Sequence, residues 1–301
     1  MNEQNIVINS PKAWFLAARP KTLSGAAVPV LIGTAFALYD SWIYEGLTFK
    51  PLAAVLCFLF AFVMQIDANF VNDYFDYVHG NDNQERLGPK RACAMGWVTI
   101  TAMRKALVLT SLIACVIGLP LICFGGWQMI LVGIICVLFC FLYTTHLSYL
   151  GLGDVLVLLF FGMVPVCFTY YVQHRMISGE VLWASVACGI VIDALLMVNN
   201  YRDIRNDEHC GKRTLAVRLG AHNSRIVYLA IGLVAFLMGI LYLFTGKPWA
   251  FLLPAIYLFL HIVTYRKMVI ANEGRALNGI LGATARNIFI YGVLLTIGIL
   301  L

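Results

Sequence analysis

Long apolar runs, separated by short polar segments, dominate the chain. A run of about 17–25 mostly apolar residues is long enough to cross a bilayer as a helix. Such runs lie near residues 23–39, 51–73, 104–123, 126–143, 152–173, 181–200, 226–245, 248–265 and 284–301. The runs at 126–143 and 248–265 each follow a neighbour after a very short turn. The pattern predicts an all-α, polytopic membrane protein with about nine transmembrane helices bundled around a central cavity.

The composition agrees with this class. Of 301 residues, 61% are hydrophobic and only 12% are charged, whereas soluble domains carry about 25% charged residues. No soluble domain, polar linker or low-complexity tract interrupts the apolar runs. We therefore expect a single integral-membrane domain over residues 1–301, made of two similar helical halves at roughly 11–150 and 151–301.

The basic residues predict the orientation. With a cytoplasmic N-terminus, all of the 21 Lys and Arg residues except Lys50, Arg175 and Lys247 fall in cytoplasmic segments. Cytoplasmic loops of membrane proteins carry this excess of positive charge. The polar first twenty residues have no secretory cleavage site, so we expect no removed signal peptide. The net charge of +6 suits anionic lipid heads or an anionic substrate.

Two acidic clusters stand where apolar runs end on the predicted cytoplasmic side. The chain has fifteen Asp and Glu residues, and these clusters with their flanks hold Asp73, Asp76, Asp82, Glu85, Asp203, Asp207 and Glu208. Carboxylates at a membrane boundary are costly to desolvate. A bound cation is the simplest reason to concentrate them there.

Helical spacing places the polar side chains of each cluster on one face. Residues three, four and seven apart share a helix face, and this spacing relates Asn69, Asn72, Asp73 and Asp76 in the first cluster and Asn200, Asp203 and Asp207 in the second. If the two stripes face each other, they form a cage of oxygen atoms. Asp193, seven residues before Asn200, either joins this cavity or bonds to another helix.

Carboxylate and amide oxygens without well-placed His or Cys suit a hard cation such as Mg²⁺, which keeps waters and binds substrate phosphate. Basic residues beside both clusters fit a diphosphate: Arg86, Lys90, Arg91, Lys212 and Arg213. The phosphate-binding P-loop sequence is absent. The alternative, that these acids only pair with nearby Lys and Arg in solvated loops, does not explain two matched stripes.

The motifs resemble the UbiA superfamily of intramembrane prenyltransferases. Asn72-Asp73-x-x-Asp76 with Gly80-x-Asp82 is similar to the first superfamily motif, and Asp203-x3-Asp207 to the second. The segments 72–91 and 211–220, the opening 18–23 and Gly151-Leu-Gly-Asp154 are similar to the menaquinone branch, the 1,4-dihydroxy-2-naphthoate polyprenyltransferases. The resemblance covers nearly the whole chain.

This resemblance implies Mg²⁺-dependent transfer of a polyprenyl group from polyprenyl diphosphate to 1,4-dihydroxy-2-naphthoate, with decarboxylation, at the cytoplasmic face of the bacterial inner membrane. Two Mg²⁺ ions would be held by Asn72, Asp73, Asp76, Asp203 and Asp207. The carboxylates would be catalytic together with Tyr143, a candidate for stabilising the allylic cation. Substrate-binding candidates are Asn69, Asp82, Arg19, Lys21, Lys90, Arg91, Asn200, Arg202, Lys212 and Arg213.

Other interpretations remain at this stage. The acceptor could be another molecule, such as 4-hydroxybenzoate or a haem. An ion-coupled transporter would place its acids near mid-bilayer, and here Asp67 and Asp193 are the deep ones. A membrane scaffold gives no reason for matched acidic stripes. We expect lipid and the two substrates as partners, no nucleic acid and no obligate protein partner.

Overall fold

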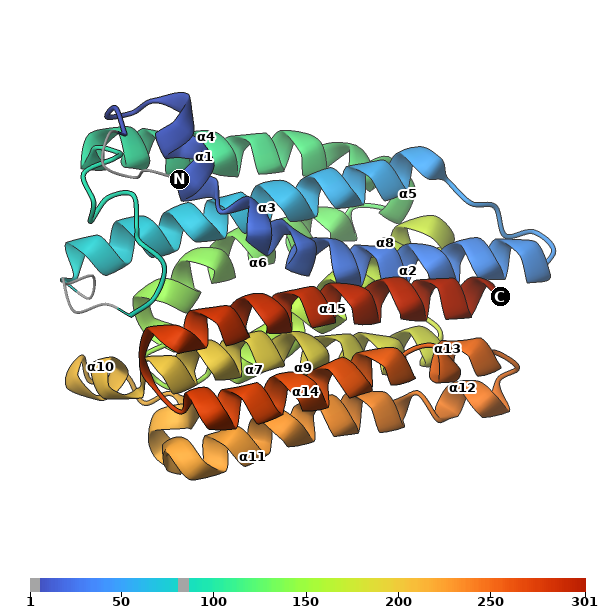
Figure 1. Ribbon diagram of the computed structural model, residues 1–301. Coiled ribbons are helices and arrows are strands. Elements are labelled where there is room, and N and C mark those ends of the chain that lie inside the picture. Colours follow the sequence, from blue (N-terminus) through green and yellow to red (C-terminus); the bar gives the residue numbers. More distant parts are fainter. Residues whose placement is uncertain (1–5, 81–86) are drawn as a thin grey trace.

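Long, roughly antiparallel helices form the protein (Figure 1). The computed structural model describes residues 6–80 and 87–301, and within these ranges it contains no strands. The helices of the N-terminal part are α1 (Pro11–Ala18), α2 (Leu23–Ile43), α3 (Pro51–Val78), α4 (Ile100–Gly118), α5 (Ile122–Gly125) and α6 (Gln128–Leu142). Next come α7 (Gly153–Val157), α8 (Val164–His174), α9 (Gly179–Arg202) and α10 (Ile204–His209). The last are α11 (Leu215–Met238), α12 (Leu241–Phe244), α13 (Pro248–Leu252), α14 (Ala255–Ala271) and α15 (Leu277–Leu300).

The expected number of membrane crossings is confirmed. Among the described residues, nine helical segments are long and apolar enough to span a membrane. Both runs that follow short turns are separate segments, Gln128–Leu147 and Pro248–Ala271. The first of these turns contains Gly126 at φ +83°, a conformation that glycine adopts without strain. Several crossings combine short helices: π-helical turns at Tyr143–Leu147 and Leu158–Met163 extend α6 and join α7 to α8.

Small residues allow close helix packing near the centre of the bundle. A Cβ atom on Gly162 would lie 2.5 Å from the Cα of Gly189. The backbone of the π-helical turn Leu158–Met163 therefore contacts the backbone of α9. Small residues are enriched at such membrane helix contacts. The C-terminal helix α15 packs along α2, so the last and the first long helices of the chain are neighbours.

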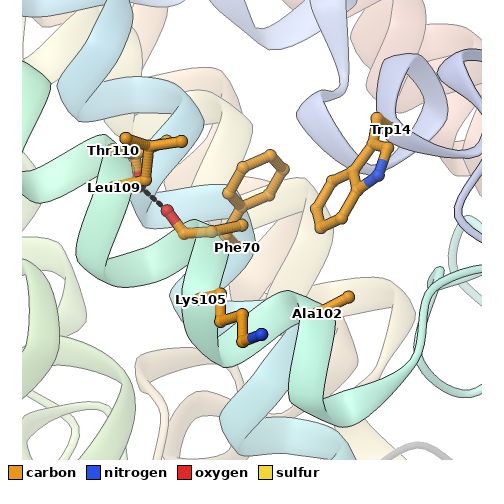
Figure 2. A pocket seen from close by; sticks show the side chains of 7 residues that line it. Trp14, Phe70, Ala102, Lys105, Leu109 and Thr110 are labelled. Atoms are coloured by element: carbon orange, nitrogen blue, oxygen red, sulfur yellow. Dashed lines mark hydrogen bonds between the residues drawn. The ribbon is translucent and has the colours of Figure 1, made fainter.

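The N-terminal helix α1 packs onto the bundle. Its Trp14 ring meets Phe70 of α3 edge-on, with centroids 5.6 Å apart. A pocket of about 410 Å³ lies between α1, α3 and α4, where Figure 2 shows Lys105 beside apolar side chains. No carboxylate lines this pocket, so it differs in character from the cavity described next.

The two acidic clusters lie at one end of the bundle. α3 ends there, and α10 follows α9 at the same end, as Figure 1 shows. The helix direction changes at Asp203, whose φ of −100° and ψ of 10° separate α9 from α10. This end therefore gathers the polar segments that the sequence places after the second and sixth crossings.

Candidate active site

One large cavity runs lengthwise through the bundle. Its volume is about 960 Å³, and its wall along α3 extends from Cys57 to Asp76. Those residues span about 28 Å of helix at 1.5 Å per residue. Polar side chains of α3 and α10 gather at one end of the cavity, and we call the part lined by Asn72, Asp76, Asp203, Asp207 and Lys212 the polar end. The remainder, the apolar channel, is lined mainly by hydrophobic side chains.

The apolar channel opens sideways along α6. Ile130, Ile134 and Leu138 line the cavity, yet they are 47%, 58% and 50% exposed on the outside of the protein. Hydrophobic side chains that are exposed on a membrane-spanning helix face lipid tails. The channel therefore communicates with the lipid surroundings next to this helix.

The first acidic cluster is split between two tasks. Asn72 and Asp76 line the cavity. The Asn72 side-chain oxygen accepts a hydrogen bond from the Thr144 hydroxyl at 2.6 Å. The Asp76 carboxylate accepts one from Arg91 at 2.6 Å and lies 3.8 Å from the Lys212 ammonium. These two side chains confirm that α3 presents oxygen atoms to the cavity.

Asp73 makes different contacts, and its role as a catalytic metal ligand stays a prediction. It is fully buried, and its two oxygens accept hydrogen bonds from the backbone N–H groups of Ala92 and Cys93 at 2.8 and 2.9 Å. Arg19 lies 3.9 Å from the same carboxylate. Asp73 thus holds the segment that leads into α4 and does not line the cavity.

Asn69 is also turned away from the cavity. Its amide nitrogen donates to the Ala18 carbonyl oxygen and to the Thr22 hydroxyl, both at 2.9 Å. It therefore ties α3 to the segment between α1 and α2. Both partners belong to the protein itself, and a contact of Asn69 with substrate stays a prediction.

The second acidic cluster lines the cavity from the opposite side. Asn200, Asp203 and Asp207 all belong to its wall. The backbone N–H of Asp207 donates to the carbonyl oxygen of Asp203 at 2.8 Å, which fixes the short α10 directly after α9. The predicted spacing of this cluster is therefore realised across a helix break.

Arg202 positions Asp203 from behind. Its guanidinium donates to both Asp203 oxygens, at 2.8 and 2.5 Å, and also to Asn199 and Asn278. The Arg202 side chain is fully buried and does not line the cavity. Its donors are turned to protein acceptors, and substrate binding by Arg202 stays a prediction.

Both clusters line one cavity, and Lys212, which follows α10, lies 3.8 Å from Asp76 of α3. The pKa of Asp207 is raised from 3.8 to about 6, mainly by burial; the negative charges of Asp203 and Asp76 contribute to this rise, while Lys212 and Arg202 oppose it. Asp76 comes from α3 and Asp207 from α10, so carboxylates of both clusters act on one another. A cation bound among them would relieve this repulsion.

The predicted basic residues divide into two groups. Arg19, Arg91 and Lys212 line the cavity. Lys212 also lies over the Tyr149 ring, 5.3 Å from its centroid. The side chains of Lys21, Lys90 and Arg213 are exposed and outside the cavity wall, and their part in substrate binding stays a prediction. Asp82 lies outside the described residues.

Tyr143 lines the cavity as predicted, where α6 passes into a π-helical turn. Other polar residues of the cavity wall were not predicted as site residues. The wall also contains Asn199, Asn206 and Asp154. The two asparagines flank predicted residues, and Asp154 ends the glycine-rich Gly151-Leu-Gly-Asp154 segment, so each had a signal in the sequence.

The oxygen atoms of the polar end fit a hard divalent cation that also binds water and substrate phosphate. Within residues 6–80 and 87–301, no three acidic, His or Cys side chains come close enough together to hold a metal by themselves. Asn72, Asp76, Asp203 and Asp207 instead offer oxygen atoms around one space. Mg²⁺ is usually bound in this way, through few protein oxygens with waters and substrate phosphate.

A membrane-spanning bundle with a carboxylate-lined polar end and an apolar channel open to lipid defines a class of proteins that hold a lipid-tailed anion. Within that class, the chain belongs to the UbiA prenyltransferase family, whose model matches residues 27–291. The predicted resemblance is thereby confirmed.

Individual relatives agree with this assignment. The chain is 36% identical over 236 residues to the 1,4-dihydroxy-2-naphthoate octaprenyltransferase of Escherichia coli K12, which covers 75% of this chain and 73% of that protein. Among solved structures, an apo UbiA homolog from Aeropyrum pernix K1 aligns with a TM-score of 0.69 at 15% identity, over 91% and 96% of the two chains. A UbiA homolog from Archaeoglobus fulgidus bound to GPP and Mg²⁺ aligns with a TM-score of 0.58 at 11% identity, over 94% and 99%.

Proposed function

We propose that this protein transfers a polyprenyl group from polyprenyl diphosphate to 1,4-dihydroxy-2-naphthoate, with loss of the ring carboxylate as CO₂, in menaquinone biosynthesis. The observation that carries the proposal is the continuous cavity, whose carboxylate-lined polar end leads into an apolar channel open to lipid. The naphthoate acceptor is supported by the relative from Escherichia coli, which carries that activity in its name.

The polar end would receive the diphosphate. Asn72, Asp76, Asp203 and Asp207 are the residues that would hold Mg²⁺, and we propose two ions. Bound Mg²⁺ supplies positive charge that neutralises the diphosphate as it leaves. Lys212, Arg91 and Arg19 line the same space and add positive charge from the protein itself.

The apolar channel would receive the prenyl tail and keep water from the reacting carbon. Its wall offers aliphatic and aromatic side chains over about 28 Å of α3. The side opening along α6 lets a long tail extend into lipid. Tyr143 belongs to the same wall, and its ring is suited to face the allylic cation that forms when diphosphate leaves.

We propose that the polar end faces the cytoplasm of a bacterium across its inner membrane. The basic residues support this orientation, since all but Lys50, Arg175 and Lys247 fall in the segments assigned to that side. A water-soluble naphthoate would then reach the cavity from the cytoplasm.

A defined reconstitution tests the proposal. Purified protein in lipid is supplied with MgCl₂, a polyprenyl diphosphate and 1,4-dihydroxy-2-naphthoate, and the products are identified by mass spectrometry. We expect a prenylated, decarboxylated naphthalenediol and diphosphate, with no product in EDTA. Product from 4-hydroxybenzoate but not from the naphthoate would reject the proposed acceptor. Turnover that EDTA leaves unchanged would reject the role of the metal.

A further inference from the structure

The cavity holds a further carboxylate that the proposed binding of diphosphate does not use. Asp154 is the second residue of α7 and lines the cavity wall. Its Oδ1 atom is shielded from solvent and has no hydrogen-bond partner among the described residues. A buried polar atom without a partner costs free energy, so an atom of this kind in a cavity wall indicates that a bound molecule completes its hydrogen bonding.

Asp193 and Tyr143 stand next to Asp154. Asp193 on α9 also has a buried oxygen without a partner in the described chain, and the charges of Asp193 and Asp154 act on each other. Both acids act electrostatically on the Tyr143 hydroxyl. A Cβ atom on Gly153 would lie 3.8 Å from the hydroxyl oxygen of Tyr143, so the backbone beside Asp154 contacts this tyrosine.

Tyr143 connects this carboxylate to the polar end. The carboxylates of Asp76 and Asp207 act on the same hydroxyl as Asp154 does. Tyr143, Asp154, Asp76 and Asp207 all line the wall of the same cavity. A flat ring that attacks a prenyl carbon beside Tyr143 would lie within reach of Asp154.

The surroundings of Asp154 suit a proton acceptor. The structure shows no salt bridge to this carboxylate in the described ranges. The nearest cation that acts on it is Arg218, whose guanidinium is engaged with the Leu150 carbonyl oxygen at 2.9 Å. Asp193, Tyr143 and Arg218 are the titratable groups that the structure shows acting with Asp154. An acid that is not held in an ion pair, and that has one oxygen without a hydrogen-bond partner, can exchange a proton with a ligand.

We propose that Asp154 is a further catalytic residue, which accepts the proton of the acceptor's ring hydroxyl during prenyl transfer and then returns it. The C–O bond of the prenyl diphosphate breaks, and its electron pair leaves with diphosphate. The ring carbon that bears the carboxylate forms the new C–C bond with a π electron pair. On the adjacent ring carbon, a lone pair of the hydroxyl oxygen forms the π bond of a ketone. The O–H bond breaks, its electron pair stays on the oxygen, and the proton passes to Asp154.

The second half of the cycle regenerates the enzyme. The intermediate is a β-keto carboxylate, which loses CO₂ and leaves the C–C electron pair as an enolate. Asp154 gives its proton to the enolate oxygen, and the ring is aromatic again. No proton is gained or lost overall, and no oxidant or reductant is needed. This inference rests on the proposed prenylation of a hydroxylated aromatic acid.

The test compares Asp154→Asn with Asp154→Glu and with Asp40→Asn. Asp40 is a matched control, because it is a buried acid outside the cavity whose carboxylate accepts a hydrogen bond from Tyr170. Rates with Mg²⁺, polyprenyl diphosphate and 1,4-dihydroxy-2-naphthoate are measured from pH 6 to the alkaline limit of protein stability. Thermal unfolding of each variant establishes that it is folded.

We expect Asp154→Asn to lower kcat about 100-fold or more, with little change in the KM for the donor. Glu should restore part of the rate, and Asp40→Asn should keep it. The rate of Asp154→Asn should recover as alkali ionises the acceptor hydroxyl, because the acceptor then needs no base. Wild-type kcat in a folded Asp154→Asn variant would overturn the inference, as would a loss that neither Glu nor alkali repairs. Wild-type protein that prenylates no acceptor would instead refute the proposed function.

Discussion

At the scale of single residues, adjacent acids in one motif have different tasks. Asp76 and Asn72 line the cavity, whereas Asp73 is bonded to the backbone of Ala92 and Cys93. Arg202 and Asp203 divide in the same way, with the arginine buried behind the carboxylate. Each motif thus combines residues that contact the cavity with residues that hold those contacts in place.

Asp73→Ala should therefore destabilise the protein. The substitution leaves the N–H groups of Ala92 and Cys93 buried without an acceptor, which should cost about 2–4 kcal/mol of unfolding free energy. Chemical denaturation of the purified protein in detergent measures this change. Unchanged stability together with lost Mg²⁺-dependent binding of a prenyl diphosphate would instead indicate that Asp73 is a metal ligand.

Asp207→Asn should raise the stability of the protein and lower its activity. The folded protein holds the pKa of Asp207 at about 6 instead of 3.8, so its ionised form is disfavoured by folding. In the metal-free protein, this destabilisation is full above about pH 6 and absent below about pH 4. The Asn variant should therefore gain roughly 1–3 kcal/mol at pH 7.5 and little at pH 4.

The same variant should lose at least about 100-fold in prenyl transfer, because a proposed ligand of the diphosphate-bound metal is gone. Thermal unfolding at both pH values and a product assay with increasing MgCl₂ provide the two measurements. A stable Asp207→Asn protein with full activity would remove Asp207 from the proposed site.

Arg202→Lys should lower activity although the charge is kept. One ammonium group cannot replace a planar fork that bonds Asp203 at both oxygens and reaches Asn278. Changes to residues that orient a metal ligand typically cost 10–100-fold, so we expect a fall of about that size in kcat or in Mg²⁺ affinity. Exposed Arg205→Lys, which pairs with Glu273 at the surface, is the control and should leave both unchanged.

At the scale of helices, α6 sets the shape of the apolar channel. Gly133 lines the channel, and a Cβ atom there would meet no atom within 4 Å. Gly133→Phe should thus fit without strain and fill part of the channel. We expect a raised KM for long prenyl diphosphates and little change for short ones, measured with donors of graded length.

Gly279→Phe on α15 is the matched control. Its Cβ position is equally open, but this residue does not line the cavity. It should leave the preference for chain length unchanged. An equal change in both variants would show that the effect does not arise in the channel.

At the scale of the whole molecule, an odd number of crossings places the two ends of the chain on opposite sides. With nine spanning segments in the described ranges and a cytoplasmic N-terminus, Leu301 should lie outside the cytoplasm. Alkaline phosphatase fused after Leu301 should therefore be active, and green fluorescent protein fused at the same position should be non-fluorescent. The reverse result would invert the proposed orientation.

Sequence pattern predicted the architecture well, because apolar runs of membrane length have few alternatives. It also brought Asn72, Asp76, Asp203 and Asp207 to one place through helical spacing. It did not show that Asp73, Asn69 and Arg202 lie outside the cavity wall, because their contacts depend on segments that pack beside them in three dimensions. Spacing tells which face of a helix a residue occupies but not whether protein or cavity lies opposite. The division into two similar halves remains a prediction.

The cavity connects water with lipid, and two of the three products, diphosphate and the prenylated ring, belong to different phases. Diphosphate is soluble only in water, next to the polar end, while the prenylated ring partitions into oil through the side opening at α6. Once released, the products no longer meet in a common phase. The shape of the cavity therefore separates these two products, and reversal would require both to return from opposite sides of a phase boundary together with the lost CO₂.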